Sequence, residues 1–589
     1  MTFGPLASPA ASASMEMSGS AQSRTATTQQ QLDESIAILS EQAPTFARLS
    51  ASERAGLLRA CIPRLQQVAA DWAAAACKAK GISLTAPQAS EEWLGGPMVT
   101  TRCVRLLIKS LDDIHKTGKP VLPSHPFRTG WDGRTEVNVF PGDGWDKVLF
   151  AGFTCALRLQ PGITEAQARE QQALLYSTRN PKPGVSLILG AGNVASIPPT
   201  DALYKLFHEG KVCLVKLNPV NEYLGPFYER AFQPLVERGF LRFVYGGGDV
   251  GSYLSYHPAI EDIHITGSDR THDLIVWGKP GPDRDRRLAA NDPLLKKQIT
   301  SELGCVTPVM IVPGDYSPTE LRFLAENIAS QVTNNASFNC NAAKIVVVSE
   351  GWTQRDAFWQ LLRDVLAEVP PRIAYYPGAQ DRFATLTAGK DKALRLGQAT
   401  ADRLPWTMIR GLDPAAKDEP LFSTEPFCSI LSEVALTERE PAAFLTAAAA
   451  FANDKLWGTL SCSIYIHPRT ERSSEVATAL DMAVGSLRYG LVAINHWPGV
   501  GYGMMTPSWG GHPSATLQNI QSGLGFVHNT FMIEGIEKAV LRGPQVVRPK
   551  PPWFVTHKTS HHLAELMARF EAEPSVLKVP GILSQALRG

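Results

Sequence analysis

The stretch Val185-Ser-Leu-Ile-Leu189 decides the fold class, because it is an uninterrupted apolar run of strand length, followed at once by the glycine turn Gly190-Ala-Gly192. Val212-Cys-Leu-Val-Lys216 is a second run of the same kind, and the residues between them, Asp201 to Glu209, are typical of a helix. Continuous apolar strands separated by helices are characteristic of a parallel sheet covered on both faces. We therefore predict an α/β fold.

The same alternation extends outward from these two runs. Further strands are predicted at Leu241–Tyr245, Ile263–Thr266, Val306–Val312, Lys344–Val348 and Ser463–Ile466. Helices are predicted at Gly225–Arg238 and Pro318–Val332, and over Gln31 to about Lys80 with Ser50 or Ser52 as an internal cap. The charged, proline-containing stretch Lys279–Gln298 is predicted to be a surface loop at the seam between two units.

The chain is long enough for several domains, since 589 residues exceed the usual size of one domain. We expect a tail at residues 1–30 and a first domain at 31–298, with an arm near 140–160. A second domain is expected at 299–500, a return to the first region at 501–545 and an extension at 546–589. The arm includes Val148–Leu159, whose partly alternating pattern can pair with another subunit.

Charge and hydropathy exclude two classes of protein. The 57 basic side chains balance 56 acidic ones, so no basic field exists to bind nucleic acid. No apolar run approaches the roughly 18 residues of a membrane span. The nine scattered cysteines contain no CxxC pair, which favours free thiols, no metal and a reducing compartment such as the cytoplasm.

Gly246-Gly-Gly-Asp-Val-Gly251 is a literal GxGxxG motif after a predicted strand. Gly247 and Gly251 are candidates for a nucleotide phosphate turn, but a short helix and no ribose-binding carboxylate follow them. An ordinary tight turn with close backbone packing explains the glycines equally well, so both interpretations stay open on this motif alone.

Several further motifs stand in a fixed order along the chain. They are Ile265-Thr-Gly-Ser268, Ser301-Glu-Leu-Gly304, Asn339-Cys-Asn-Ala342, Thr424-Glu-Pro-Phe427 and Phe451–Gly458. From about residue 31 to about residue 530, this series resembles the aldehyde dehydrogenase superfamily. The resemblance implies a Rossmann-type parallel-sheet cofactor domain, an α/β catalytic domain and an oligomerisation arm in a homodimer or homotetramer. It also implies oxidation of an aldehyde to a carboxylic acid with NAD or NADP.

The resemblance implies three catalytic residues. Cys340 matches the nucleophile, which adds to the aldehyde carbonyl and later carries a thioester. Glu302 matches the general base that activates water to hydrolyse this thioester. Asn193, with the backbone N–H of Cys340, matches the donors that stabilise the oxyanion. The simpler alternatives are an inert buried thiol, a solvated glutamate and an asparagine that only forms a turn, and Cys305 is the nearest rival nucleophile.

The resemblance also implies a set of cofactor contacts. The residues are Lys216, Thr266, Gly267, Ser268, Glu425 and Phe427. Lys216 is expected to reach the ribose or phosphate oxygens, and the Thr-Gly-Ser turn to lie beside the pyrophosphate and nicotinamide. Glu425 is expected to bind the nicotinamide ribose. A proline, Pro219, stands where many NAD-specific members have an acidic residue, so NADP stays possible.

Departures from the family pattern leave alternatives open. The Gly192-Asn-Val194 turn replaces Pro-Trp-Asn and resembles the fatty acyl-CoA reductases, which would form an aldehyde from a thioester with NADPH. Glu302 favours oxidation, because a water-activating base would hydrolyse that thioester. A third alternative is an inactive binding protein on the same fold. Trp509–Gly511 and Gly523–Lys538 either line the substrate entrance or serve ordinary packing.

Overall fold

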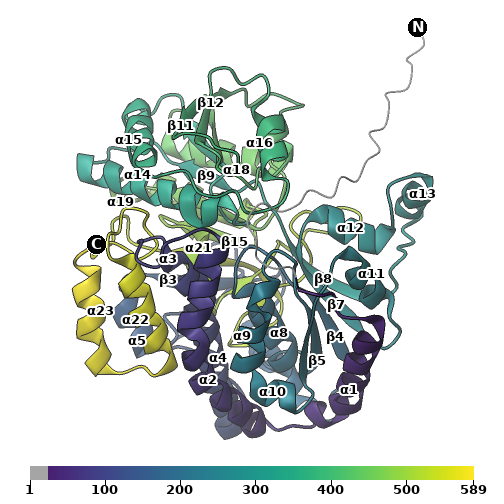
Figure 1. Cartoon of the computed structure of the whole chain (residues 1–589). Coiled ribbons are helices and arrows are strands. Elements are labelled where there is room, and N and C mark those ends of the chain that lie inside the picture. The colour runs from purple at the N-terminus through teal and green to yellow at the C-terminus, as the bar shows by residue number, and fades with distance from the viewer. Residues whose placement is uncertain (1–23) are drawn as a thin grey trace.

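A doubly wound parallel sheet forms one half of the molecule. Figure 1 shows the computed structural model, which describes residues 24–589. Within these residues, five strands form this sheet in the order β6-β5-β4-β7-β8. The strands are β4 (Val185–Leu189), β5 (Val212–Lys216), β6 (Leu241–Val244), β7 (Asp262–Gly267) and β8 (Gln298–Leu303). The chain winds outward from β4 in both directions, so the carboxyl ends of β4 and β7 form the switch point where ligands bind in such sheets.

The strands predicted at Val185–Leu189 and Val212–Lys216 are confirmed with the same bounds. The helices on this sheet include α8 (Ile197–Phe207), α9 (Gly225–Ala231), α10 (Gln233–Glu237), α11 (Gly248–Tyr256) and α12 (Asp269–Trp277). The loop predicted over Lys279–Gln298 is wrong in part, because α13 (Pro282–Ala290) lies within it. None of the residues of α13 is buried, so this helix has no apolar periodicity that could be detected in the sequence.

A larger sheet forms the other half. Eleven strands of the described chain follow the order β1-β2-β3-β18-β15-β14-β9-β10-β13-β12-β11. They are β1 (Phe127–Thr129), β2 (Thr135–Phe140), β3 (Thr154–Leu159), β9 (Pro308–Ile311), β10 (Ile345–Ser349), β11 (Leu394–Leu396), β12 (Trp406–Leu412), β13 (Ile430–Leu436), β14 (Ser461–Tyr465), β15 (Leu491–Ile494) and β18 (Ile536–Arg542). The strands from β18 to β12 pair in parallel, and helices α14 (Pro318–Thr333), α15 (Arg355–Glu368), α18 (Pro441–Lys455) and α20 (Ser474–Ser486) accompany them.

The predicted arm belongs to this larger sheet. Residues 148–159 end the helix α5 (Gly144–Leu149) and form β3, which pairs antiparallel with β2 on one side and β18 on the other. Both edges of β3 are therefore occupied within the chain, and the expectation that this segment pairs with another subunit is corrected. A homodimer or homotetramer remains a prediction.

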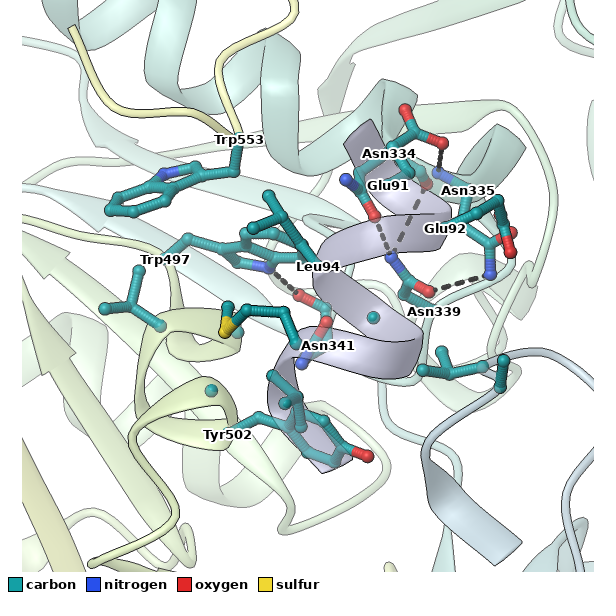
Figure 2. Close-up of a pocket in the computed structure, with 18 of the residues that line it drawn as sticks. Glu91, Glu92, Leu94, Asn334, Asn335, Asn339, Asn341, Trp497, Tyr502 and Trp553 are labelled. Carbon is teal, nitrogen blue, oxygen red and sulfur yellow. Dashed lines mark hydrogen bonds between the residues drawn. The ribbon is translucent and has the colours of Figure 1, made fainter. Parts of the chain in front are cut away.

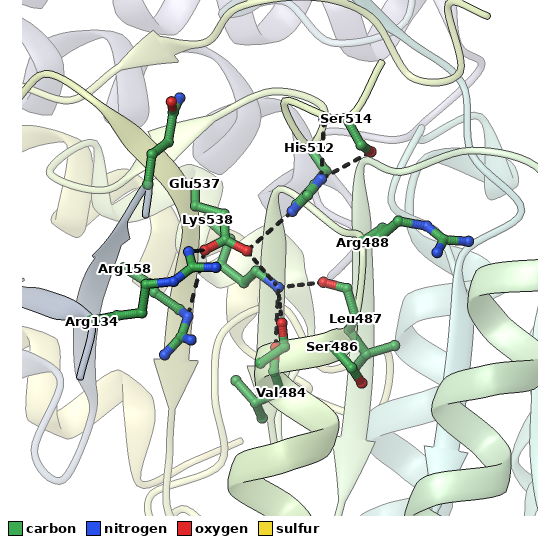
Figure 3. Close-up of polar contacts among 12 residues, drawn as sticks. Arg134, Arg158, Val484, Ser486, Leu487, Arg488, His512, Ser514, Glu537 and Lys538 are labelled. Carbon is green, nitrogen blue, oxygen red and sulfur yellow. Dashed lines mark hydrogen bonds and ion pairs between the residues drawn. The ribbon is translucent and has the colours of Figure 1, made fainter. Parts of the chain in front are cut away.

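Strand β18 is held in place by a buried lysine (Figure 3). Lys538 has no exposed surface, and its ammonium donates to the carbonyls of Val484, Gly485 and Leu487 at the end of α20. A helix C-terminus carries partial negative charge, so it offsets the cost of burying this cation. The neighbouring Glu537 pairs with arginines that include Arg158, on β3. Residues 501–545 are thereby joined to the half that contains the eleven-stranded sheet.

The N-terminal helices and the C-terminal extension pack together against the first half (Figure 1). The N-terminal elements are α1 (Gln29–Ala47), α2 (Ala51–Ala79), α3 (Ala89–Trp93), the π-helical turn η1 (Leu94–Met98) and α4 (Val99–Thr117). The extension contributes α22 (Ser560–Ala572) and α23 (Val579–Ala586), of which α22 lies against α3, η1 and α4. Ser50 caps α2 as predicted.

The predicted tail ends earlier than residue 30. Residues 1–23 lie outside the described residues, but the backbone N–H of Thr27 donates to the Tyr245 carbonyl at 3.1 Å, and α1 begins at Gln29. Between residues 24 and 589 no helix combines the length and the hydropathy needed to cross a bilayer.

Candidate active site

The loop that carries Cys340 runs from the end of α14 to the start of β10. All nine cysteines are free, and Cys340 is the one that is not fully buried. Its Sγ lies 3.2 Å from Oε1 of Glu302, which closes β8 in the other sheet. The rival Cys305 has no exposed surface and lines neither of the two cavities next to Cys340. The structure therefore brings the predicted thiol and carboxylate together and leaves Cys305 in the core.

The backbone before Cys340 is unusual. Asn335, Ala336 and Ser337 follow one another with φ of +52°, +54° and +69°, a region that residues other than glycine rarely adopt. Such a run costs free energy and persists only where the surroundings impose it. The surroundings here are hydrogen bonds: the Asn335 amide donates to the carbonyl of Asn193 at 2.9 Å and to Oδ1 of Asn339 at 3.0 Å.

A buried lysine lies at the centre of that network. Lys80, at the end of α2, pairs with Glu92 at 2.8 Å and donates to Oδ1 of Asn335 and to the carbonyl of Asn193. The Tyr375 hydroxyl donates to the same two acceptors. One cluster of polar side chains therefore sets the relative position of the loop with Cys340 and the turn with Asn193.

Burial controls the protonation of the thiol and its partner. It raises the pKa of Glu302 to about 7, and the negative charge of Asp201 adds to this effect. Burial, with the nearby carboxylate of Glu302, also raises the pKa of the Cys340 thiol well above its usual range. The resting pair is thus a protonated thiol beside a carboxyl group that titrates near neutral pH, which is the arrangement expected for a nucleophile activated by a general base.

Two N–H groups stand near the sulfur. Asn193 is 6% exposed, and its side-chain amide donates to the carbonyl of Phe338 at 2.9 Å, so one of its two amide protons is engaged. The backbone N–H of Cys340 donates to no acceptor among residues 24–589. Both Asn193 and Cys340 line the two cavities that meet at this point.

The larger cavity, of about 810 Å³, lies at the switch point of the five-stranded sheet. It is lined by all eight residues for which the sequence predicted cofactor contacts, namely Lys216, Gly247, Gly251, Thr266, Gly267, Ser268, Glu425 and Phe427. The ammonium of Lys216 forms no ion pair or hydrogen bond with any described residue, and burial lowers the pKa of this lysine. Gly247 precedes the first residue of α11, so the glycine turn faces the cavity.

Glu425 approaches this cavity from the catalytic half. Burial raises its pKa to about 7, although the ammonium of Lys344 opposes the shift. Its Oε1 is buried without a hydrogen-bond partner among the described residues. A β-carbon on Gly304 would lie 2.0 Å from its other oxygen, so only glycine leaves room for the carboxylate there. Phe427 adopts φ of +42° and lies over the Lys344 ammonium, 5.6 Å from its ring centre.

The Thr-Gly-Ser turn ends β7 and starts α12. The Thr266 hydroxyl donates to the buried Asp201 at 2.9 Å, and Ser268 caps α12 by accepting the backbone N–H of Thr271. His264 lies 3.5 Å from the same carboxylate of Asp201. Polar side chains behind the turn thus anchor it at the mouth of the cavity.

The segments around Trp509 and Gly523 lie beside the strand that carries Glu302, and the Trp509 side chain opposes part of the rise in the pKa of that carboxyl. Neither Trp509–Gly511 nor Gly523–Lys538 contributes to the lining of the two cavities at Cys340. The carbonyls of Ser522 and Leu524 accept the backbone N–H groups of Leu303 and Ser301, on either side of Glu302. These segments therefore support the strand that carries the carboxylate.

Comparison with solved structures identifies the fold. No protein-family model matches the sequence. Aldehyde dehydrogenase 21 from Physcomitrella patens, solved with succinate, matches at 12% identity and a TM-score of 0.58 over 88% of this chain and 90% of that one. An NAD-dependent aldehyde dehydrogenase from Sinorhizobium meliloti matches at 17% and 0.57, over 89% of both chains. Glyceraldehyde-3-phosphate dehydrogenase from Methanocaldococcus jannaschii, complexed with NADP, matches at 14% and 0.56, over 88% and 96%.

The chain has the aldehyde dehydrogenase fold. The predicted fold class is therefore confirmed, and the match spans nearly all of each compared chain.

Several residues of the site were not predicted from the sequence. They include Lys80, Glu92, Asn335 and Tyr375 in the polar network. Lys80 and Glu92 are separated from Asn335 by more than 240 positions, and no local spacing connects them. Within the aldehyde dehydrogenase fold they meet because α2 and α3 pack beside the loop that carries Cys340. The π-helical turn η1 offered one signal, since Gly95-Gly-Pro97 interrupts a helical stretch and such turns are frequent at functional sites.

Proposed function

We propose that this protein oxidises an aldehyde to a carboxylic acid with NAD or NADP, through a thioester on Cys340. The observation that carries the proposal is the pair formed by Cys340 and Glu302, with Sγ and Oε1 3.2 Å apart. The pair lies where a large cavity at the sheet switch point meets a smaller one. The fold alone does not establish an activity, so the argument rests on this geometry.

The residues of the larger cavity fit a nicotinamide dinucleotide. Lys216, which has no partner among residues 24–589, offers a cation for phosphate or ribose oxygens. Oε1 of Glu425, likewise without a hydrogen bond to the described residues, offers an acceptor for ribose hydroxyls. Gly247 and Gly251 allow close approach of the backbone to phosphates. Because Pro219 supplies no carboxylate to repel a 2′-phosphate, both NAD and NADP are proposed. When bound, the nicotinamide accepts the hydride that leaves the aldehyde carbon.

In the first half of the proposed reaction, Glu302 takes the proton of the Cys340 thiol as the sulfur bonds to the aldehyde carbon. The carbonyl π electrons move to oxygen, which becomes an oxyanion. The second amide proton of Asn193 and the free backbone N–H of Cys340 can donate to this oxyanion. Loss of hydride from the same carbon then leaves a thioester on Cys340. Glu302 then releases the thiol proton to solvent and is again a carboxylate.

In the second half, water attacks the thioester carbon while Glu302 takes a proton from that water and passes it to the leaving sulfur. The carbon–sulfur bond breaks, the carboxylic acid departs and the sulfur of Cys340 regains its proton. A base with a pKa of about 7 is well suited to this step, because about half of it is deprotonated at neutral pH and that form accepts a proton readily.

Two parallel absorbance assays of reduced nicotinamide test the proposal. One offers a panel of aliphatic and aromatic aldehydes with NAD or NADP, and the other offers acyl-CoA thioesters with the reduced cofactors. Formation of reduced cofactor without coenzyme A is the expected result. Consumption of reduced cofactor only with thioesters would make the protein a reductase, and no change in either assay would contradict both activities.

A further inference from the structure

A second cavity lies on the other side of Cys340 and Asn193 (Figure 2). Its volume is about 130 Å³, which is room for on the order of ten water-sized groups. Both Cys340 and Asn193 belong to its wall. An acyl group bonded to the sulfur therefore has this cavity available to it, away from the large cavity at the sheet edge.

One side of this cavity is apolar and aromatic. Trp497 precedes the helix α21 (Pro498–Met504), and its indole N–H donates to the Asn341 carbonyl at 2.8 Å. Its ring is thus held in place with its polar atom satisfied. Figure 2 shows Trp553 and Leu94 on the same side. Pro552 and Met567, the latter on α22, also line the cavity, so three residues of its wall come from the C-terminal extension, residues 546–589.

The polar side chains in the wall are mostly bound to partners within the protein. Lys80 is paired with Glu92, and Asn339 donates to Oδ1 of Asn334 at 2.8 Å. Among the described wall residues, two fully buried side-chain nitrogen or oxygen atoms lack a partner, Oδ1 of Asn341 and Nε1 of Trp553. The cavity can therefore offer single hydrogen bonds to a neutral substituent, but it holds no free charge to neutralise an ion.

The extension is fixed to both halves of the molecule. Glu571, on α22, pairs with Arg102 of α4 at 2.8 Å, and Arg102 also pairs with Asp146 at 2.6 Å, all deeply buried. On the other side, the backbone N–H of Val555 donates to the Ser330 hydroxyl at 2.9 Å. Because Trp553 lies just before this second anchor, its position in the wall is determined by the docked extension.

We propose that the C-terminal extension completes an acyl pocket and that Trp553 limits the length of the substrate. The substrate class is a compact, uncharged aldehyde with an aliphatic chain or a single ring. This inference rests on the proposed function, because the ligand of the pocket is a substrate only if the protein oxidises aldehydes. The existence of the pocket itself is tested without turnover. Residues far from the family-like motifs thus determine which aldehyde reaches Cys340.

The test uses alkyl methanethiosulfonates on the full chain, because their attachment reports the pocket and not the oxidation. The Cys340 sulfur bonds to the sulfenyl sulfur of the reagent, methanesulfinate leaves, and a mixed disulfide remains. The labelling rate is measured from the intact mass of the protein, and peptide mapping shows that the label is on Cys340. Each rate is divided by the rate of the same reagent with glutathione, which corrects for the intrinsic reactivity of the reagent. Each methylene buried in the pocket is expected to increase the rate about threefold to fourfold until the pocket is full. A sulfonatoethyl reagent should react far more slowly than propyl.

Trp553→Ala should shift the chain-length limit of labelling to longer chains, and Met567→Ala should shift it more weakly. The Met567→Ala variant tests the same pocket if Trp553→Ala does not fold. Leu577→Ala is the matched control, because Leu577 lies on the extension but is 87% exposed. Rates that ignore chain length and charge, or an unchanged limit in both pocket variants, would overturn the inference. If the protein oxidises aldehydes but the labelling rate shows no chain-length limit, the acyl pocket is rejected and the proposed function stands. The expected labelling with no oxidation would reject the proposed function alone.

Discussion

The two cavities that meet at Cys340 are built in different ways. The larger one, about 810 Å³, is formed by the ends of parallel strands and by glycine turns, with an unpaired lysine and a partly orphaned glutamate. The smaller one, about 130 Å³, is formed by side chains from separate segments, including Trp497, Trp553 and η1. Backbone geometry thus builds the cavity suited to a common cofactor, and side-chain packing builds the cavity that we propose selects the substrate.

The largest expected effect comes from the residue that both cavities share. Cys340→Ala should reduce turnover by at least about 10⁴-fold, since nothing else in the wall replaces the nucleophile. Binding of NAD or NADP, measured by fluorescence of the reduced cofactor, should persist. Cys305→Ser is the control and should keep most of the activity. Normal rates in Cys340→Ala would remove this thiol from the mechanism.

Glu302→Gln should slow steady-state turnover about 10²- to 10⁴-fold, the usual contribution of a general base. Reduced cofactor should still form once per site if water or another group removes the thiol proton, and the thioester should then accumulate and be visible by mass. Unchanged steady-state turnover would exclude Glu302 as the base.

The same carboxylate predicts the pH dependence. Because its pKa is raised from 4.5 to about 7, the active carboxylate form is lost as pH falls through about 7, and turnover should fall with it. The folded state also binds this proton more tightly, so the group contributes stability below about pH 4.5 that is lost as pH rises through 7. Glu425 titrates in the same range, so Glu425→Gln is the control that should keep the acidic limb of the activity profile.

Arg102→Met tests how the smaller cavity depends on the extension. The change leaves Asp146 buried without its cation, and breaking such a pair costs about 3–5 kcal/mol of unfolding free energy. Thermal unfolding should shift down accordingly, and the chain-length limit of Cys340 labelling should weaken in the remaining folded protein. Cofactor binding at the other cavity should change little. If cofactor binding weakens as much as the chain-length limit of labelling, the two cavities are not independent.

Glu425→Gln should have the smallest effect. Replacing the carboxylate removes one charge-assisted hydrogen bond, worth about 1.5–3 kcal/mol, so the KM for the cofactor should rise about tenfold or more. The labelling of Cys340 by short alkyl reagents should not change. A larger effect on labelling than on cofactor KM would contradict the assignment of Glu425 to the cofactor side.

Four strands of the five-stranded sheet were predicted from short, mainly apolar runs, whereas β8, with the sequence Gln-Ile-Thr-Ser-Glu-Leu, is too polar to stand out and was not predicted. β4 and β5 have the predicted bounds, whereas α13 was missed because a helix with no buried residue carries no apolar stripe. The role of β3 was also misjudged. Its alternation shows that it pairs, but its partner β18 lies more than 370 residues later, and no local pattern contains that information.

The residues of the candidate site also fall into two groups, those that sequence motifs indicate and those that only tertiary packing brings to the site. Cys340, Glu302 and Lys216 occur in short motifs whose order along the chain is recognisable. Lys80 and Trp553, by contrast, acquire their places only through packing of α2 and of the extension. A lysine at a helix end and a tryptophan after a proline-rich linker are ordinary features of a sequence. Their contribution to the site follows from tertiary contacts, which single-sequence patterns do not encode.

The shared wall of the two cavities has a consequence for inhibition kinetics. Cys340 and Asn193 belong to both linings, whereas Trp553 lines only the smaller cavity and Glu425 only the larger one. A reversible compound that fills the smaller cavity leaves the larger one accessible. Such an inhibitor should compete with the aldehyde but remain non-competitive toward the dinucleotide, and a compound confined to the sheet edge should show the reverse pattern.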